Sequence, residues 1–262
     1  MATPVFCCGA ECGQSGLVGQ HSALVGTAAF STTTVNNGAR SFRVNPTGGI
    51  GDYFSLALPS AANIMVARFY IRFTTLPDGD CSLGVSQAGT FFKGAVFKQS
   101  DSSIYAGIVG ATFTFGATGV AVTTGVWYRV DVEINSSANP HLIDVQVDGI
   151  AAGQATEAVA TANSQTIRLG HSFAAARTMD IFFDDALFSQ TAADYPFGDG
   201  YVNHFVPTAD GTHNVAGAAD FRRGGTTTDI LNTTTDAYLL VDDVPLDDAT
   251  PDTDDHIRIV AP

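Results

Sequence analysis

The chain of 262 residues has few of the long charged side chains that cover exposed helices. It contains two Lys and three Glu, and charged residues make up only 15% of the sequence against 45% hydrophobic residues. Asp supplies most of the acid, and Asp favours turns and caps over helix interiors. With 27 Gly and no segment of convincing helical period, this composition indicates β-structure.

Positive charge is also scarce, and the formal net charge is −14. Such a chain is repelled by phosphate, which argues against direct binding to nucleic acid or to an anionic membrane. No run of about eighteen apolar residues is present to span a bilayer. The N-terminal "MATPVFCC" has neither the basic region nor the apolar core of a signal peptide, so we expect synthesis in a cytoplasm.

Alternating apolar and polar residues indicate many short strands. The pattern is clearest in 63–77, 125–137 and 141–149, and the turn residues "NSSANP" between the last two predict an antiparallel hairpin. The fold class that follows is all-β, with two packed antiparallel sheets. The other expected strands are 41–46, 52–59, 81–87, 92–99, 103–110, 111–117, 165–172 and 179–190.

The succession "GVWYRVDVEI", "LIDVQVDG", "IRLG" and "DIFFDDALF" resembles the concanavalin A-like jelly roll of the laminin-G-like kind, over roughly residues 5 to 190. The resemblance implies a two-sheet antiparallel jelly-roll sandwich over 1–192. It also implies that "VFCCGAECG" pairs with "DIFFDDALF" in the closing sheet. Residues 193–262 would then form a β-rich C-terminal extension with an acidic arm.

Two later segments, 195–217 and 238–260, resemble the end of virion proteins from tailed bacteriophages. Asp243 stands where Glu is usual. The resemblance implies a non-enzymatic structural component of the virion, in the head decoration, the neck or collar, or the tail. It would be made in a host cytoplasm, form a homo-oligomer and contact other virion proteins. The residues expected in subunit contacts are Tyr201, Phe205, Phe221, Arg222, Arg223, Tyr238 and Leu240, with the two arginines seating the Asp-rich arm 242–255 of a neighbour.

Three cysteines crowd the start of the chain, at Cys7, Cys8 and Cys12. They lack the paired C-x-x-C spacing of zinc and redox sites, and neighbouring residues of a strand point to opposite faces. Packing as small apolar side chains in a terminal strand is therefore favoured. The alternative is a disulfide formed in an oxidising medium, with Cys81 or another subunit supplying the distant partner.

The sandwich resemblance invites a test for glucanase chemistry at "RVDVE". Retaining glycosidases need two closely spaced carboxylates, one of them the nucleophile. Asp131 and Glu133 share a strand face, but Arg129 occupies the nucleophile position, so we expect a solvated or subunit-facing row of charges and no enzyme. No Ser/His/acid order is legible among the scattered histidines, which are His21, His141, His171, His204, His213 and His256.

A carbohydrate-binding adhesin, or lectin-like module, is the alternative function. Related sandwiches bind sugars through loops at one edge, often beside calcium held by Asp, Asn and backbone oxygens. The candidate acids are Asp148, Asp184 and Asp185, with Phe182 and Tyr201 available to stack on a cell-surface glycan. The Asp-rich run 242–255 does not match the EF-hand loop. Apart from calcium at the loop edge, no cofactor is expected.

Overall fold

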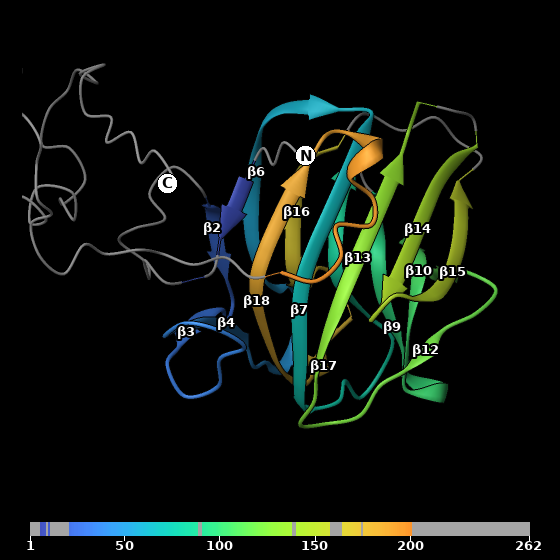
Figure 1. Cartoon of the computed structure of the whole chain (residues 1–262). Helices are drawn as coiled ribbons and strands as arrows, with labels where there is room; N and C mark the ends of the chain where they lie inside the picture. The colour runs from blue at the N-terminus through green and yellow to red at the C-terminus, as the bar shows by residue number, and fades with distance from the viewer. Residues whose placement is uncertain are drawn as a thin grey trace, which may run out of the picture. The chain divides into compact units, whose positions relative to one another are not determined.

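The computed structural model describes residues 6–8, 10, 21–88, 91–137, 140–157, 164–173 and 175–200 (Figure 1). The chain divides into two compact units, Met1–Asn203 and His204–Pro262, and all the described residues belong to the first. Within them the regular structure consists of strands and two short 3₁₀ turns, η1 (Gln99–Asp101) and η2 (Ala192–Asp194). None of the described helical segments is long and apolar enough to cross a membrane.

Sheet A is one of two large antiparallel sheets in the described residues. It has eight strands, in the order β15-β14-β13-β7-β18-β4-β3, with β1 also paired to β18. Its strands are β1 (Phe6–Cys8), β3 (Ala29–Ser31), β4 (Ser41–Val44), β7 (Ile64–Thr75), β13 (Trp127–Asn135), β14 (His141–Val147), β15 (Ile150–Glu157) and β18 (Asp180–Ser189).

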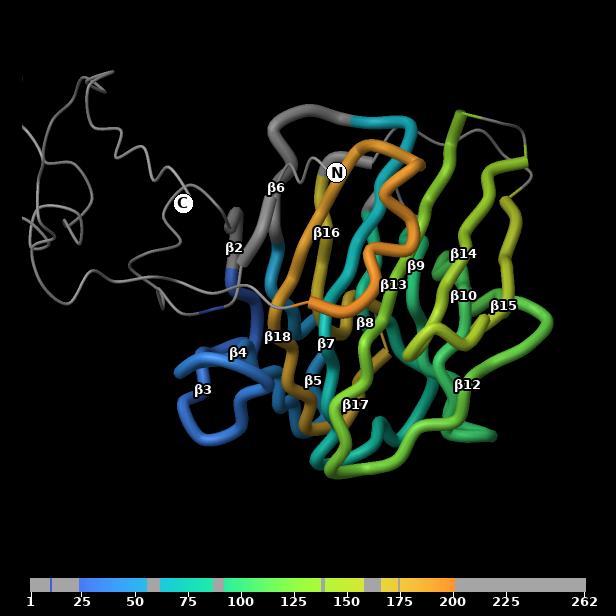
Figure 2. Tube along the Cα trace, viewed as in Figure 1, coloured from blue at the N-terminus to red at the C-terminus, as the bar shows by residue number. Residues whose placement is uncertain are grey.

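Sheet B lies behind sheet A in the view of Figure 2 and also has eight described strands. Its order is β11-β10-β9-β8-β16-β6-β2, with β12 also paired to β10. Its strands are β2 (His21–Val25), β6 (Asp52–Ala62), β8 (Cys81–Ala88), β9 (Phe91–Lys98), β10 (Ser103–Val109), β11 (Phe113–Phe115), β12 (Val120–Ala121) and β16 (Ser164–His171). A small ribbon joins β5 (Thr47–Gly49) to β17 (Arg177–Thr178).

The core fills the space between the two sheets, as the period of two predicts. On β7 the buried Phe69, Ile71 and Phe73 face inward and alternate with Arg68, Tyr70 and Arg72 on the outer face. Sheet B contributes Phe54 and Phe97 to the same core. Burial of a large apolar side chain stabilises the fold by about 1.5–3 kcal/mol, so this layer supplies most of the driving force.

A smaller cluster covers the opposite face of sheet B. Val85, Val96, Tyr105 and Val109 pack there under partly buried phenylalanines of which Phe113 and Phe173 meet edge to face. Its residues alternate along the strands with core residues such as Phe97. The phenylalanine-rich hairpin of β10 and β11 therefore covers its own sheet face.

The all-β sandwich expected from the sequence is confirmed. β13 and β14 form the expected antiparallel hairpin, and Val130 pairs with Val147. The predicted closing pair is also present, because Phe6 lies opposite Phe188 and Cys8 lies opposite Ala186.

The strand β15 was not expected, since "IAAGQATE" has few β-branched or aromatic residues. A tight turn brings it into the sheet. Asp148 and Gly149 both adopt positive φ, of 50° and 80°, and Val147 pairs directly with Ile150. Asp-Gly in this conformation matches the twist of a two-residue hairpin. The turn itself was visible in the sequence and could have predicted the strand.

Candidate binding face on sheet A

The outward side chains of sheet A form transverse rows across neighbouring strands. In one row, Arg72 on β7 lies between Phe182 on β18 and Trp127 on β13. In the next row Tyr70 lies between Asp184 and Arg129, and after that Arg68 lies between Leu187 and Asp131. Neighbouring strands are about 4.8 Å apart and alternate residues about 7 Å apart, so these side chains form a close two-dimensional array.

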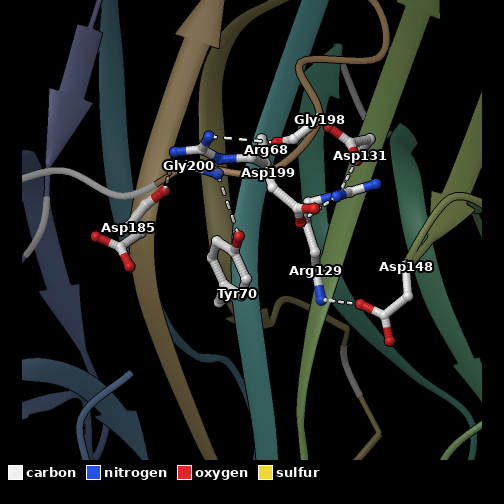
Figure 3. A network of polar contacts seen from close by, with 9 residues as sticks. All are labelled: Arg68, Tyr70, Arg129, Asp131, Asp148, Asp185, Gly198, Asp199 and Gly200. Carbon is white, nitrogen blue, oxygen red and sulfur yellow. Dashed lines mark hydrogen bonds and ion pairs between the residues drawn. The ribbon is translucent and has the colours of Figure 1, made fainter. Parts of the chain in front are cut away.

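The segment from Gln190 to Gly200 crosses this face above β7 and β13 (Figure 1). Three residues at its end hold it there, and Figure 3 shows them. The Arg129 guanidinium pairs with the Asp199 carboxylate, Arg68 Nη1 donates to the Gly198 carbonyl at 3.4 Å, and the Gly200 amide donates to the Tyr70 hydroxyl at 3.4 Å. We call these contacts the clamp.

A buried ion pair lies under the clamp. Asp131 is fully buried, and Arg129 Nε donates to its Oδ2 at 2.8 Å. Burial raises the pKa of Asp131 above its ordinary value, although Arg129 and a Gly198 amide hydrogen bond act in the opposite direction. Burial would also lower the pKa of Arg129, but Asp199 and Asp131 together raise it. Arg129 is therefore a fixed cation that neutralises two carboxylates.

The far edge of the segment is fixed by a tyrosine. The Tyr195 hydroxyl donates to Asp144 Oδ1 at 2.8 Å, and Gln154 Nε2 donates to the other oxygen of Asp144 at 2.6 Å. Burial raises the pKa of Glu133, the neighbour of Asp144 across the strands, and the Asp144 charge adds to the effect. This half of sheet A is thus occupied by the chain's own residues.

The row beyond Tyr70 contains Arg43, Phe182, Arg72 and Trp127, and we call it the open row. Phe182, expected to stack on a glycan, is buried at 3% exposure, and the other three side chains are partly exposed. Trp127 is the single tryptophan of the sequence and is partly exposed, as are Arg72 and Tyr70. Arg43 forms a two-pronged pair with Asp180, with Nε–Oδ1 at 2.8 Å and Nη2–Oδ2 at 3.0 Å, and stacks over Phe182. Within the described residues, Arg72 has no ion pair or hydrogen bond. The open row therefore offers an aromatic surface beside an uncommitted guanidinium.

Of the three acids expected at a glycan or calcium edge, Asp148 and Asp184 lie at opposite ends of one row of sheet A, and Asp185 lies in the register break next to Asp184. Asp148 is exposed and its Oδ1 accepts a hydrogen bond from the Arg129 amide at 2.8 Å. Asp184 is separated from it by Tyr70 and Arg129, which at sheet spacing is about 14 Å. Among the described residues no group of three His, Cys, Asp or Glu side chains is placed to hold a metal ion.

Asp184 and Asp185 instead hold the loop before β4. Asp184 Oδ2 accepts hydrogen bonds from the Asn36 amide at 2.9 Å and the Asn37 amide at 3.4 Å, and Asp185 Oδ2 accepts one from Asn36 Nδ2 at 3.0 Å. Burial raises the pKa of Asp184 to about 7. Both residues sit at a break in the β7–β18 register, where Asp185 has a φ of 48°.

Of the cysteines, Cys81 is a free thiol that is completely buried in the core. Burial raises its pKa far above the ordinary value. Cys7 and Cys8 lie on β1, but their side chains and Cys12 are outside the described residues, so a disulfide among them stays a prediction. The expected subunit-contact residues, from Tyr201 to Leu240, also lie outside the described residues.

The charge row of "RVDVE" was expected to face solvent or another subunit, and this expectation is wrong for its first two charges. Arg129 and Asp131 are buried, with Asp199 paired to Arg129 and the Gly198 amide bonded to Asp131. Arg72 and Trp127 were not expected as site residues, although their alternation with core residues placed them on an outer face. Residues 193–200, which the sequence assigned to the C-terminal extension, include Gly200, whose amide contacts Tyr70 of sheet A.

No protein-family model matches the chain, and no curated protein matches it. Similar solved structures exist. An endo-β-1,4-glucuronan lyase from the fungus Trichoderma reesei matches with a TM-score of 0.51 and 13% identity, over 73% of this chain and 98% of the lyase. A cellulose-induced protein, Cip1, matches with a TM-score of 0.50 and 13% identity, over 71% of this chain and 97% of Cip1. A sialidase from Trypanosoma rangeli reaches 0.43 at 12% identity, over 65% of this chain and 30% of the sialidase.

These likenesses show the fold, a sandwich-type β protein of jelly-roll character. They also correct one expectation, that the chain is not an enzyme. The glucuronan lyase, 98% of which is matched by this chain, is an enzyme with the same sandwich fold. The arginine at one carboxylate position argues only against a retaining glycosidase pair in "RVDVE".

Proposed function

We propose that this chain is a carbohydrate-recognition module of a tailed-bacteriophage particle, and that the open row of sheet A binds a sugar carrying a carboxylate. The observation that carries the proposal is the position of Arg72. It lies beside Trp127 on an outer sheet face, and within the described residues it has no ion pair or hydrogen bond.

The chemistry of the row matches such a ligand. A tryptophan ring presents a broad apolar surface, on which the C–H face of a sugar ring can lie. The guanidinium fork of arginine pairs with a carboxylate through two parallel hydrogen bonds. Trp127 and Arg72 are neighbours across β13 and β7, so one sugar ring with its carboxylate spans both.

The clamp contains an arginine–carboxylate pair of the same kind on the same face. Arg129 already binds an exposed carboxylate there, that of Asp199, whose side chain is 89% exposed. Arg72 is diagonal to Arg129, about one row further along the strands. The charge of −14 disfavours any loose attraction of anions, so an acidic sugar must be recognised by local pairing of this kind.

The particle context is supported by the sequence segments 195–217 and 238–260, most of which lie outside the described residues. A role in assembly is the second candidate, and the clamp favours it. Arg68, Tyr70 and Arg129 hold Gly198 to Gly200, which directly precede Tyr201, the first of the expected contact residues. A contact segment that starts from a fixed point loses less entropy when it binds.

Binding is tested by titration calorimetry with glucuronan oligosaccharides, chosen because one neighbour of the same fold is a glucuronan lyase. Neutral cello-oligosaccharides of the same length serve as the comparison. We expect binding of the acidic ligand and its loss in Trp127→Ala and Arg72→Ala. Lys98→Ala, which removes a positive charge from sheet B, is the matched control and should bind as the native chain does. Equal binding by all three variants would exclude the open row.

The particle context is tested separately, by immunogold electron microscopy of purified particles with antibody against the recombinant chain. Regular label on the head or neck supports assembly, and label at the tail tip supports an adhesin. Absence of the chain from the particles by mass spectrometry would reject both, without affecting the calorimetric result.

A further inference from the structure

A lysine, a histidine and a glutamate meet inside the sandwich, away from the face described above. Lys93 on β9 of sheet B points between the sheets, opposite the core residue Ile108, and its side chain is 0% exposed. His141 and Glu157 are direct partners across β14 and β15 of sheet A, and both are buried. Lys93 reaches across from sheet B to contact both.

The three groups have the contacts that a condensation requires. Lys93 Nζ lies against Glu157 Oε2. His141 Nδ1 is 2.8 Å from Lys93 Nζ and 3.3 Å from Glu157 Oε2. One ring nitrogen therefore reaches both the nitrogen that would attack and the oxygen that would leave.

The surroundings favour neutral groups over charged ones. Separated charges are costly to keep in an apolar core, and an ion pair there recovers only part of the lost hydration. A proton that moves from the Lys93 ammonium to the Glu157 carboxylate leaves a free amine against a carboxylic acid. Lys98, the other lysine of the chain, is partly exposed to water, with its Nζ 3.6 Å from Asp101 Oδ2.

We propose that Lys93 and Glu157 condense to an amide that links the two sheets covalently. The amine nitrogen attacks Glu157 Cδ, and His141 Nδ1 accepts the proton that the nitrogen loses. The same proton passes to Oε2, the Cδ–Oε2 bond breaks, and one water leaves. No oxidant or further reactant is needed, and two buried charges are replaced by one amide.

The bond joins β9 of sheet B to β15 of sheet A, which are 64 positions apart in the sequence, since 157 − 93 = 64. A cross-link of this kind restricts the unfolded chain, as a disulfide does. The sandwich would then resist forced separation of its sheets without depending on the redox state of its surroundings. Such a property suits a protein exposed outside the cell.

The test is the intact mass of the full chain, reduced and denatured. The linked chain should be about 18 Da lighter than its sequence, the mass of one water. After trypsin digestion, residues 73–98 should appear joined to residues 130–168, because an amidated Lys93 is no longer a cleavage site. A chain of full sequence mass, or a loss of water located elsewhere, would overturn the proposal.

Three variants make the result specific. In Lys93→Met/Glu157→Leu both partners become apolar, so the sandwich should fold and show its full sequence mass. Lys98→Arg should keep the 18 Da loss. His141→Asn should leave a fraction of unlinked chain that decreases over hours, because it removes the proton carrier but neither partner. Immediate and complete linkage in His141→Asn would show that the histidine does not carry the proton. It would contradict that step of the proposal but not the amide bond.

Discussion

Arg129 and Asp199 are ion-paired across 70 positions of the sequence, and their contact fixes the last described residues of the chain on the outer face of sheet A. The pair is unequal, because Arg129 is buried and Asp199 is 89% exposed. Loss of the arginine and loss of the aspartate therefore have different consequences.

Arg129→Ala should destabilise the sandwich by about 3–5 kcal/mol, since Asp131 would be left buried without its cation. Asp199→Ala should cost about 1 kcal/mol or less, as expected for an exposed partner. Urea unfolding followed by tryptophan fluorescence measures both. Arg129→Met/Asp131→Leu should recover much of the stability lost in the single variant. If the double variant is as unstable as Arg129→Ala, an unpaired buried charge is not what destabilises the single variant.

Asp184 should make stability depend on pH near neutrality. Its pKa is raised from 3.8 to about 7 by burial, so the folded state favours the protonated form. The stability that protonated Asp184 contributes is complete below about pH 4. It is lost as the pH rises through 7, and the free energy of unfolding falls by no more than about 1.4 kcal/mol per pH unit. Relative to Asp184→Asn, the native chain should lose stability over this range. Unfolding curves at four pH values measure the difference, and parallel profiles would contradict it.

Binding at the open row should depend on salt through Arg72. The Debye length is about 10 Å at 0.1 M salt and about 3 Å at 1 M, so added salt should weaken the binding of an acidic oligosaccharide to the native chain. Trp127→Phe should retain part of the affinity because a smaller aromatic face remains, whereas Trp127→Ala should lose about tenfold or more. Affinity that is unchanged by salt would show that Arg72 does not pair with the ligand.

Cys81 should be inert in the folded protein. Its thiol is completely buried and burial raises its pKa, so neither the thiolate nor an access path is present. Pulse labelling with a maleimide, followed by peptide mass spectrometry, should leave Cys81 unmodified until urea is added. Labelling in native buffer would show that the core around β8 opens, and a disulfide to Cys81 found in the same map would show a different packing of the N-terminal cysteines.

Much of the sandwich could be predicted from local sequence. The alternation in 63–77 and 125–137 follows from the two-residue period of a strand, which sorts side chains to two faces regardless of what lies beyond them. The turn residues between 135 and 141 predicted the hairpin for a similarly local reason. β15 escaped because its Ala-rich sequence has little strand preference of its own and is ordered by its partner β14.

The sequence by itself determined which residues face inward and that the product is a two-sheet sandwich, because periodicity and burial act along the chain. Only the tertiary structure decided which outward residues are covered. Arg129 on β13 and Arg72 on β7 are diagonal neighbours on the same outer face, and both alternate with core residues along their strands. Arg129 is nevertheless buried under Asp199, whereas Arg72 is partly exposed. The difference depends on where residues 190–200 cross the sheet. In the same way, only the packing of sheet B on sheet A brings Lys93 to Glu157, since a contact between sheets has no signature in the period of either strand.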